Sequence, residues 1–241
     1  MKKDNALVII PTYNNPLTIK DVARDVLKHG FEVIIVDDGS DAPIENLFHE
    51  DEKENIYFVR HEVNRGKGEA IVSGVKKAKD LGFESVVSID GDGQHLASQI
   101  QKLVDAHGHD EIIIGARNFN LENIPNGSKF GRWFSNFWAC WDTGQVITDS
   151  LSGFRIYPVS ILSLAIKTSR FDWEMEVLVR HADAGKQIKE VDIECYYPTP
   201  RERVSHFKKF GDTAAIVWVH LQILPLKWPR FILNKILRRN R

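Results

Sequence analysis

Cysteine is scarce in this 241-residue chain, which has only Cys140 and Cys195. The two lie far apart in unlike surroundings, so the sequence predicts neither a disulfide framework nor a paired metal motif, and a reducing cytoplasm is the expected compartment. Long apolar runs are lacking too. No stretch reaches the ~18 apolar residues of a membrane-spanning helix, and the apolar run that follows residues 1–5 is too short and too poorly flanked for a signal peptide.

An excess of charge of one sign is also missing. The chain has 32 Lys and Arg against 33 Asp and Glu, a formal net charge of -1. This balance lacks the charge footprint of a dedicated nucleic-acid binder, so we expect no nucleic-acid partner. Because the sequence shows neither repeats nor a flexible linker, we expect one domain with a substantial core and an appendage at the C-terminus.

Strand-like and helix-like segments alternate through the first half, which is typical of parallel βαβ units. The predicted strands are 6–10, 32–36, 56–59, 85–89 and 111–114, and the predicted helices are 16–29 and 67–81. Polar residues follow each of the first four strands. Because ligands bind beyond the carboxyl ends of the strands in open parallel sheets, we expect these four loops to meet at one edge. The predicted fold class is α/β, with a mostly parallel sheet and helices on both faces.

Two acidic residues, Asp90 and Asp92, flank Gly91 at the end of the predicted strand 85–89. With the chain turning at Gly91, both carboxylates can face one hard cation that also needs phosphate oxygens and water, so Mg²⁺ or Mn²⁺ is expected. Gln94 and His95 could complete or orient the metal shell, and a histidine ligand would favour Mn²⁺. The alternative is a solvated turn, but the position among other polar loops favours the metal site.

Two further loops suit a nucleotide. In the segment 37–40, one of Asp37 and Asp38 can accept hydrogen bonds from a ribose hydroxyl or a base N–H; the alternative is a turn that an aspartate caps. The segment 64–68, Asn-Arg-Gly-Lys-Gly, brings two cations and two glycines to the start of a helix and so suits a diphosphate through Lys67 and backbone amides. It lacks the spacing of a Walker loop or a dinucleotide fingerprint, which disfavours ATPase and dehydrogenase functions.

Four segments in order resemble motifs of glycosyltransferase family 2: Pro-Thr-Tyr-Asn-Asn at 11–15, Val-Asp-Asp-Gly-Ser at 36–40, the segment 64–68, and Asp-Gly-Asp-Gly-Gln-His at 90–95. Two more, Asp-Ser-Leu-Ser-Gly-Phe-Arg at 149–155 and Phe-Asp-Trp-Glu-Met-Glu at 171–176, resemble the polyprenyl-phosphate sugar transferase branch, typified by dolichol-phosphate mannosyltransferase. The resemblance implies a Rossmann-like GT-A fold, a nucleotide-diphosphate sugar donor and inversion at the anomeric carbon.

The resemblance also implies roles for individual residues. The implied donor-binding residues are Pro11, Tyr13, Asp38, Lys67, Asp90 and Gly91, and the implied metal ligands are Asp90, Asp92 and Gln94. The expected acceptor-binding residues are Arg117, Ser152, Gly153, Arg155, Arg203, His206 and Lys208. The basic members of this last group could instead bind the departing diphosphate or be ordinary surface charge, and His206 could be a metal ligand from a loop.

The choice of acceptor decides whether a base is needed. A phosphate acceptor arrives ionised and needs cations, whereas a hydroxyl acceptor needs a carboxylate base within hydrogen-bond reach. If a helix begins at residue 173, Asp172 and Glu176 share a face and Glu174 points away, so Asp172 and Glu176 are the predicted catalytic carboxylates besides Asp92. Alternatively, Asp172 caps the helix and the glutamates favour its dipole.

Two segments could meet a membrane. Residues 214–226 are apolar and aromatic, and every charge from residue 227 onward is basic, which suits an amphipathic helix on an anionic membrane surface. A terminal helix packed on the core is the alternative. Aromatic residues recur at helical spacing at Trp133, Phe134, Phe137, Trp138 and Trp141; core packing is the expected role and a lipid-facing surface the alternative.

Together these features predict a GT-A domain at 1–211, with a nucleotide-sugar half at 1–105 and an acceptor half at 106–211, followed by a membrane-associating tail at 212–241. The predicted function is a metal-dependent, inverting transfer to a lipid-linked acceptor at the inner face of the cytoplasmic membrane. Segments 153–158 and 203–209 also resemble transferases of bacterial aryl polyene or lipid pathways, which leaves polyprenyl phosphate and a hydroxyl acceptor both open. The alternatives are a sugar nucleotidyltransferase and a non-catalytic membrane-surface binding module.

Overall fold

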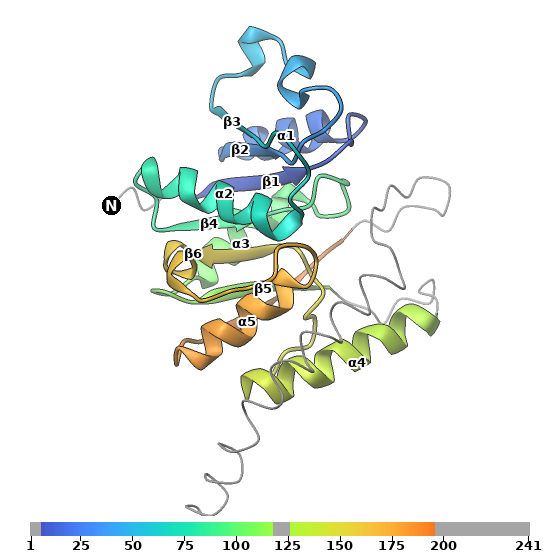
Figure 1. Cartoon of the computed structure of the whole chain (residues 1–241), viewed down its shortest axis with the longest axis vertical. Helices are drawn as coiled ribbons and strands as arrows, with labels where there is room; N and C mark the ends of the chain where they lie inside the picture. Colours follow the sequence, from blue (N-terminus) through green and yellow to red (C-terminus); the bar gives the residue numbers. More distant parts are fainter. Residues whose placement is uncertain (1–5, 118–125, 196–241) are drawn as a thin grey trace, which may run out of the picture.

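The computed structural model describes residues 6–117 and 126–195, and it is built around a seven-stranded sheet (Figure 1). The strands are β1 (Leu7–Thr12), β2 (Glu32–Asp37), β3 (Ile56–Arg60), β4 (Ser85–Ser88), β5 (Ile112–Arg117), β6 (Arg155–Pro158) and β7 (Ile188–Ile193). The helices are α1 (Ile19–Lys28), α2 (Lys67–Asp80), α3 (Ile100–Ala106), α4 (Asn126–Thr143) and α5 (Trp173–Asp183). Short 3-10 helices lie at Ile44–Leu47, Glu50–Glu52, Ala97–Gln99 and Val159–Ser163.

The strand order is β3-β2-β1-β4-β6-β5-β7. Strand β6 runs antiparallel to both of its neighbours, β4 and β5, and every other pair in the sheet is parallel. The prediction of a mostly parallel sheet is therefore confirmed. The inserted antiparallel strand separates the first four strands, which carry the polar loops, from β5 and β7.

Strand β1 shows why helices cover both faces. Its residues from Leu7 to Ile10 are fully buried, and they alternate between two cores because successive side chains of a strand point to opposite faces. Val8 and Ile10 pack with residues of α1 and α3, whereas Leu7 and Ile9 pack with residues of α2 and α5. A central strand that is apolar on both sides needs this two-sided cover.

The predicted strands and helices of the first half are all present, with ends displaced by up to three residues. Strands β6 and β7 and helix α3 were not predicted. Strand β6 has four residues and begins with a charged one, Arg155. In β7 only the terminal residues Ile188 and Ile193 are buried, since it lies at the edge of the sheet. Neither strand carries the continuous apolar run that marked the central strands.

Helix α4 packs against α5 at the end of the molecule away from β3 (Figure 1). The expectation that its aromatic residues pack into the core is wrong for three of them: Trp133 is 62% exposed, and Phe137 and Trp141 are each 48% exposed. Phe134 and Trp138 are half-buried. Within residues 6–117 and 126–195, no helix has both the length and the apolar character needed to cross a membrane. The predicted tail at 212–241 lies outside the described residues.

Candidate active site

The polar loops that follow β1, β2 and β4 are joined by hydrogen bonds. The backbone N–H of Asn14 donates to Ser40 Oγ at 2.9 Å, which links the first loop to the second. Asn15 Nδ2 donates to the carbonyl oxygen of Gly91 at 2.8 Å, which links the first loop to the acidic turn after β4. The predicted meeting of these loops at the carboxyl edge of the sheet is therefore confirmed.

Asp38 is buried beneath this edge, and its carboxylate holds the third loop. It accepts the backbone N–H groups of Arg65 at 2.9 Å and of Gly66 at 2.7 Å. Its Oδ1 also lies 2.6 Å from Nδ1 of His61, whose Nε2 faces Ser73 Oγ at 2.9 Å. Both carboxylate oxygens thus bond to protein groups, and the contact of Asp38 with a nucleoside stays a prediction. His61 was missed; its place just after β3 was the available signal.

The glycines of the segment 64–68 also differ in role from the expectation. The N–H of Gly66 bonds to Asp38 rather than pointing at a diphosphate, and its φ of +100° is one that glycine adopts without strain. A Cβ on Gly68 would lie 2.3 Å from Cβ of Trp173. These glycines therefore let the start of α2 approach α5 and the loop before it closely, and the binding of a diphosphate by Lys67 stays a prediction.

Lys67 is the first residue of α2, and its ammonium joins two elements of the site. Nζ lies 2.6 Å from Asp90 Oδ1 and 2.9 Å from Glu174 Oε1 in α5. Burial favours the neutral amine, but these two carboxylates outweigh it and hold the pKa of Lys67 above its ordinary value. Gly153 borders the cluster, because a Cβ there would lie 2.6 Å from both Asp90 Oδ2 and Lys67 Nζ.

The two predicted metal-binding carboxylates differ in their surroundings. Burial raises the pKa of Asp90, but the positive charges around it, Lys67 foremost, together outweigh burial and hold the pKa below its ordinary value. For Asp92, burial and then the charge of Asp90 raise the pKa to about 6. Asp92 Oδ1 accepts the backbone N–H of Gln94 at 3.0 Å, while Oδ2 has no hydrogen-bond donor among the described residues.

This donor set fits a hard divalent ion only in part. Two carboxylates with an open oxygen are suitable ligands for Mg²⁺ or Mn²⁺. However, no group of three or more His, Cys, Asp and Glu side chains converges on a metal position within the described residues. The burial of His95 lowers its pKa to about 4, and its Nδ1 faces Sγ of Cys195 at 3.3 Å. The protein would thus supply few ligands, and phosphate oxygens and water would supply the others.

Helix α5 begins at Trp173, as the helix prediction assumed. The inference drawn from it, that Glu174 points away, is wrong, because Glu174 is the residue that contacts Lys67. The two oxygens of Glu176 accept hydrogen bonds from the backbone of Lys167 and Thr168 and from Arg180. These bonds hold the Glu176 side chain in place, and its catalytic role stays a prediction. Four-residue spacing identifies a shared face but not the element that the face meets.

Asp172 keeps its predicted role as a proposal. Its Oδ1 accepts the backbone N–H of Arg170 at 3.1 Å, and the carboxyl side chain makes no capping hydrogen bond to α5. The alternative that Asp172 caps the helix through its side chain is therefore not supported.

Two of the residues expected to bind the acceptor are fully buried. The guanidinium of Arg155 donates to the carbonyl oxygens of Ser150, Ser152 and Glu174 at 2.7 Å each. Ser152 is 0% exposed, and its Oγ accepts the N–H of Phe154 at 3.4 Å. Both residues shape the loop that presents Gly153 to Asp90, and their contact with an acceptor stays a prediction.

The other acceptor residues are differently placed. Arg117, at the end of β5, donates from Nε and Nη2 to both oxygens of the buried Asp149, at 2.7 and 2.9 Å. Its positive charge also contributes to the low pKa of Asp90 and partly offsets the rise in the pKa of Asp92. The expected residues Arg203, His206 and Lys208 lie outside the described residues.

Of the donor residues expected on the first loop, Pro11 is the fifth residue of β1 and Tyr13 follows the strand, 37% exposed at the edge of the sheet. A Cβ on Gly91 would lie 3.6 Å from the carbonyl oxygen of Pro11, so the strand end borders the acidic turn. These positions agree with a donor site but do not test it.

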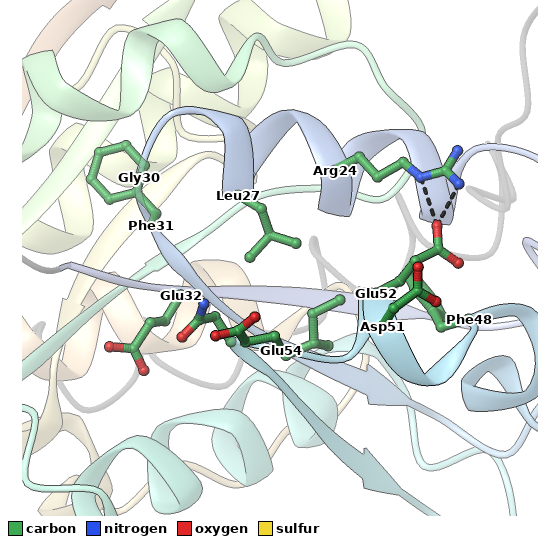
Figure 2. Close-up of a pocket in the computed structure, with 11 residues that line it drawn as sticks. Arg24, Leu27, Gly30, Phe31, Glu32, Phe48, Asp51, Glu52 and Glu54 are labelled. Atoms are coloured by element: carbon green, nitrogen blue, oxygen red, sulfur yellow. Dashed lines mark hydrogen bonds and ion pairs between the residues drawn. The ribbon is translucent and has the colours of Figure 1, made fainter.

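A surface cavity of about 440 Å³ lies elsewhere, at the amino ends of β2 and β3 (Figure 2). Glu32 and Ile56, which begin these strands, line it, and the ion pair of Arg24 with Glu52 borders it. Because it lies at the opposite end of the strands from Asp90, this cavity is not part of the candidate site.

Comparison with known proteins identifies the chemistry of this edge. Residues 7–155, more than half of the chain, match the model of Glycosyl transferase family 2. The chain belongs to glycosyltransferase family 2. It is therefore a glycosyltransferase, and neither a sugar nucleotidyltransferase nor a non-catalytic binding module is needed to explain the acidic turn.

Relatives within the family extend the match beyond residue 155. The chain is 32% identical over 213 residues to UDP-N-acetylglucosamine--dolichyl-phosphate N-acetylglucosaminyltransferase of Methanococcus voltae, covering 79% of this chain and 85% of the relative. It is 28% identical over 200 residues to undecaprenyl-phosphate mannosyltransferase of Micrococcus luteus, covering 78% and 82%. The predicted similarity to the polyprenyl-phosphate branch is confirmed.

The fold is also similar to solved structures. Glucosyl-3-phosphoglycerate synthase of Mycobacterium tuberculosis, in complex with Mn²⁺, UDP and phosphoglyceric acid, superimposes with a TM-score of 0.69. The match covers 92% of this chain and 79% of that one, at 16% identity. At this identity the likeness concerns the fold alone, and it confirms the predicted GT-A architecture.

Proposed function

We propose that this family 2 enzyme transfers a sugar from a nucleotide-diphosphate sugar to a polyprenyl phosphate. The observation that carries the proposal is the half-buried cluster of Lys67, Asp90 and Asp92 at the sheet edge, in a chain whose relatives are named for dolichyl and undecaprenyl phosphate. The donor half at 1–105 supplies all three side chains. The acceptor half begins with β5 and Arg117.

In the proposed reaction, Asp90 and Asp92 would hold Mg²⁺ or Mn²⁺, and the side chain of Gln94 would offer an oxygen ligand. The bound ion would neutralise the charge that develops on the departing nucleoside diphosphate. Lys67 contributes a second positive charge to the diphosphate. Gly153 leaves room beside Asp90 that a side chain would fill. Direct displacement at the anomeric carbon then inverts its configuration.

The carboxylates of α5 support a phosphate acceptor over a hydroxyl. A hydroxyl would need a free carboxylate base, whereas a phosphate is already ionised near neutral pH. Glu176 is fully engaged with Thr168 and Arg180, and Glu174 is paired with Lys67. Of the three carboxylates at this helix start, only Asp172 could act as a base. Arg117 provides a cation near the acidic pair for the acceptor phosphate.

Two features support association of the enzyme with a membrane surface. Trp133, Phe137 and Trp141 form an exposed aromatic stripe on α4, with neighbouring rings stacked at 6.1 and 6.4 Å. Tryptophan favours the boundary between lipid headgroups and acyl chains. The sequence after residue 226 adds only basic charge, which anionic lipids attract. We propose a peripheral association with the cytoplasmic face of the membrane, where a polyprenyl phosphate would be presented.

The decisive experiment pairs two acceptors of equal chain length, a polyprenyl phosphate and the corresponding polyprenol, with a panel of UDP-, GDP- and TDP-sugars. With polyprenyl phosphate, and not with the polyprenol, we expect labelled sugar in the lipid fraction and release of nucleoside diphosphate. Addition of EDTA and the substitution Asp92→Asn should each abolish this transfer. Transfer to the polyprenol would contradict the acceptor assignment. Release of pyrophosphate in place of nucleoside diphosphate would contradict the reaction itself.

A further inference from the structure

The ammonium of Lys67 already neutralises one of the two carboxylates expected to bind a metal ion. Its Nζ lies 2.6 Å from Asp90 Oδ1, and the lysine side chain is only 13% exposed. Solvent therefore screens the pair weakly. A divalent ion approaching Asp90 meets a carboxylate that is already neutralised and a positive charge within a few ångströms of its own position.

The protein offers such an ion little compensation. Within the described residues no three His, Cys, Asp and Glu side chains converge on a metal position. Mg²⁺ and Mn²⁺ prefer about six ligands. Asp90 and Asp92 supply two carboxylates, so most of the remaining ligands have to come from phosphate oxygens and water.

Glu174 keeps the Lys67 ammonium in the site even when it is not in contact with Asp90. Its Oε1 lies 2.9 Å from Lys67 Nζ, and it belongs to α5, which packs closely against α2 at Gly68. The flexible four-carbon stem of a lysine lets its ammonium move while the backbone stays in place. The ammonium can therefore leave Asp90 without leaving the site.

We propose that Lys67 is an exchangeable counter-ion, which Asp90 gives up for the divalent ion when a nucleoside diphosphate offers the ammonium a new anionic partner. The ion and the nucleoside diphosphate then bind together, and the ion binds weakly alone. This inference rests on the proposed metal-dependent function and adds the order in which its ligands enter. Because binding free energies are reciprocal, the ion strengthens binding of the diphosphate by the same factor.

The experiment measures Mn²⁺ affinity directly, from the electron paramagnetic resonance signal of free MnCl₂, with and without saturating UDP and, in parallel, GDP. For the wild-type protein we expect the nucleotide to strengthen Mn²⁺ binding by at least about tenfold. In Lys67→Met, Mn²⁺ alone should bind about tenfold more tightly than to wild type, and the effect of the nucleotide should shrink. Equal or weaker binding of Mn²⁺ alone to Lys67→Met would overturn the proposal.

The matched control is Arg65→Met, which removes a positive charge two residues away on an exposed side chain. It should leave the affinity for Mn²⁺ alone within about twofold of wild type. If Arg65→Met increased the affinity for Mn²⁺ as much as Lys67→Met does, the loss of any nearby positive charge would explain the effect. That result would contradict a specific exchange at Asp90.

A second variant covers the case in which Lys67→Met does not fold. In Glu174→Gln the ammonium keeps Asp90 as its only carboxylate partner, so Mn²⁺ alone should bind at least about threefold more weakly; unchanged or tighter binding would contradict the proposal. Neither titration involves sugar transfer. Failure of the proposed function would appear as absence of transfer by the wild-type enzyme, while failure of this inference would appear in the Mn²⁺ affinities of an active enzyme.

Discussion

Asp90 and Asp92 are two residues apart, yet their surroundings move their pKa values in opposite directions. The ammonium of Lys67 favours the ionised form of Asp90, whereas Asp92 is half-buried next to that negative charge and forms no ion pair within the described part of the chain. A metal ion requires both carboxylates to be ionised. The free-energy cost of ionising Asp92 in the metal-free protein therefore makes both its stability and its affinity for a metal ion depend on pH.

The stability of the metal-free protein should depend on pH through Asp92. Its pKa in the folded protein, about 6, lies above the ordinary value of 3.8, so its contribution to stability is fully present below pH ~4 and is lost as pH rises through ~6. Asp92→Asn should therefore raise the free energy of unfolding by roughly 2 kcal/mol above pH 7, with no gain at pH 4.

Thermal and urea unfolding in EDTA across pH 4–8 would measure this difference. With wild-type protein, Mn²⁺ affinity in the presence of UDP should also fall by up to about tenfold per pH unit below ~6, because Asp92 must release a proton. A pH-independent gain in Asp92→Asn would show that the ionisation of this carboxyl group is not the cause.

Asp38→Asn should destabilise the protein in the absence of any ligand. One carboxylate oxygen accepts the backbone N–H of Arg65 and the other accepts that of Gly66. An asparagine amide has only one oxygen, so one of these two hydrogen bonds would be lost. An unsatisfied buried donor costs about 1–3 kcal/mol, so urea unfolding should show a loss of that size. If Asp38 only contacted a nucleoside, nucleotide affinity would fall while the stability of the free protein stayed unchanged.

At the scale of elements, the site depends on the contact between the start of α2 and the start of α5. This contact brings Lys67 of one helix to Glu174 of the other, and it is close because Gly68 has no side chain. The N–H of Glu69 also donates to the carbonyl oxygen of Ser169 at 3.0 Å, which joins the helix start to the loop before α5. The two helices lie on the same face of the sheet (Figure 1).

Gly68→Ala should separate these helices. The added methyl group would lie 2.3 Å from Cβ and 2.4 Å from Cγ of Trp173, so the helices must shift, at a cost of about 1–3 kcal/mol in the free energy of unfolding. UDP affinity should fall as well, since Lys67 moves with the start of α2.

The control is Gly131→Ala in the exposed part of α4, where no heavy atom lies within 4 Å of the added Cβ. It should stabilise the protein by up to about 1 kcal/mol, because alanine favours a helix over glycine. Equal effects of the two substitutions in denaturant unfolding would rule out the steric explanation.

At the scale of the whole molecule, the catalytic edge and the aromatic stripe of α4 are separate features that membrane association would combine. The stripe is exposed in a helix that was expected to be largely buried. Its hydrophobic surface carries no catalytic group of its own. The stripe would act by binding the enzyme to the membrane that carries the lipid-linked acceptor.

The triple substitution of Trp133, Phe137 and Trp141 by Gln should weaken binding to vesicles of anionic phospholipid by at least about tenfold, because burial of each aromatic ring in the interface is lost. Removal of the residues after Gly211 should have a similar effect through the lost basic charge. Leu47→Gln, at an exposed apolar residue between β2 and β3, is the control and should bind as wild type. Vesicle co-sedimentation measures all three, and full binding by the triple variant would refute the role of α4.

The sequence by itself determined the alternation of strands and helices, the acidic pair at the end of β4 and the family. These are local properties, since apolar periodicity and short motifs need no knowledge of distant contacts. The sequence did not determine β6. Its four residues lie far from β4 and β5 along the chain, yet they pair antiparallel with both strands. Nor did the sequence determine the burial of Arg155, because a charged residue buries only where carbonyl oxygens are assembled around it.

Only the tertiary structure decided which groups face each other at the site. Asp38 meets His61 and the loop at 64–66, and Lys67 meets Glu174 rather than leaving that glutamate free. Spacing along a helix tells which residues share a face, but the packing of α2 against α5 decides what that face contacts. For this reason the family could be predicted from motifs, while the partners that position the acidic turn and shift its pKa values could not.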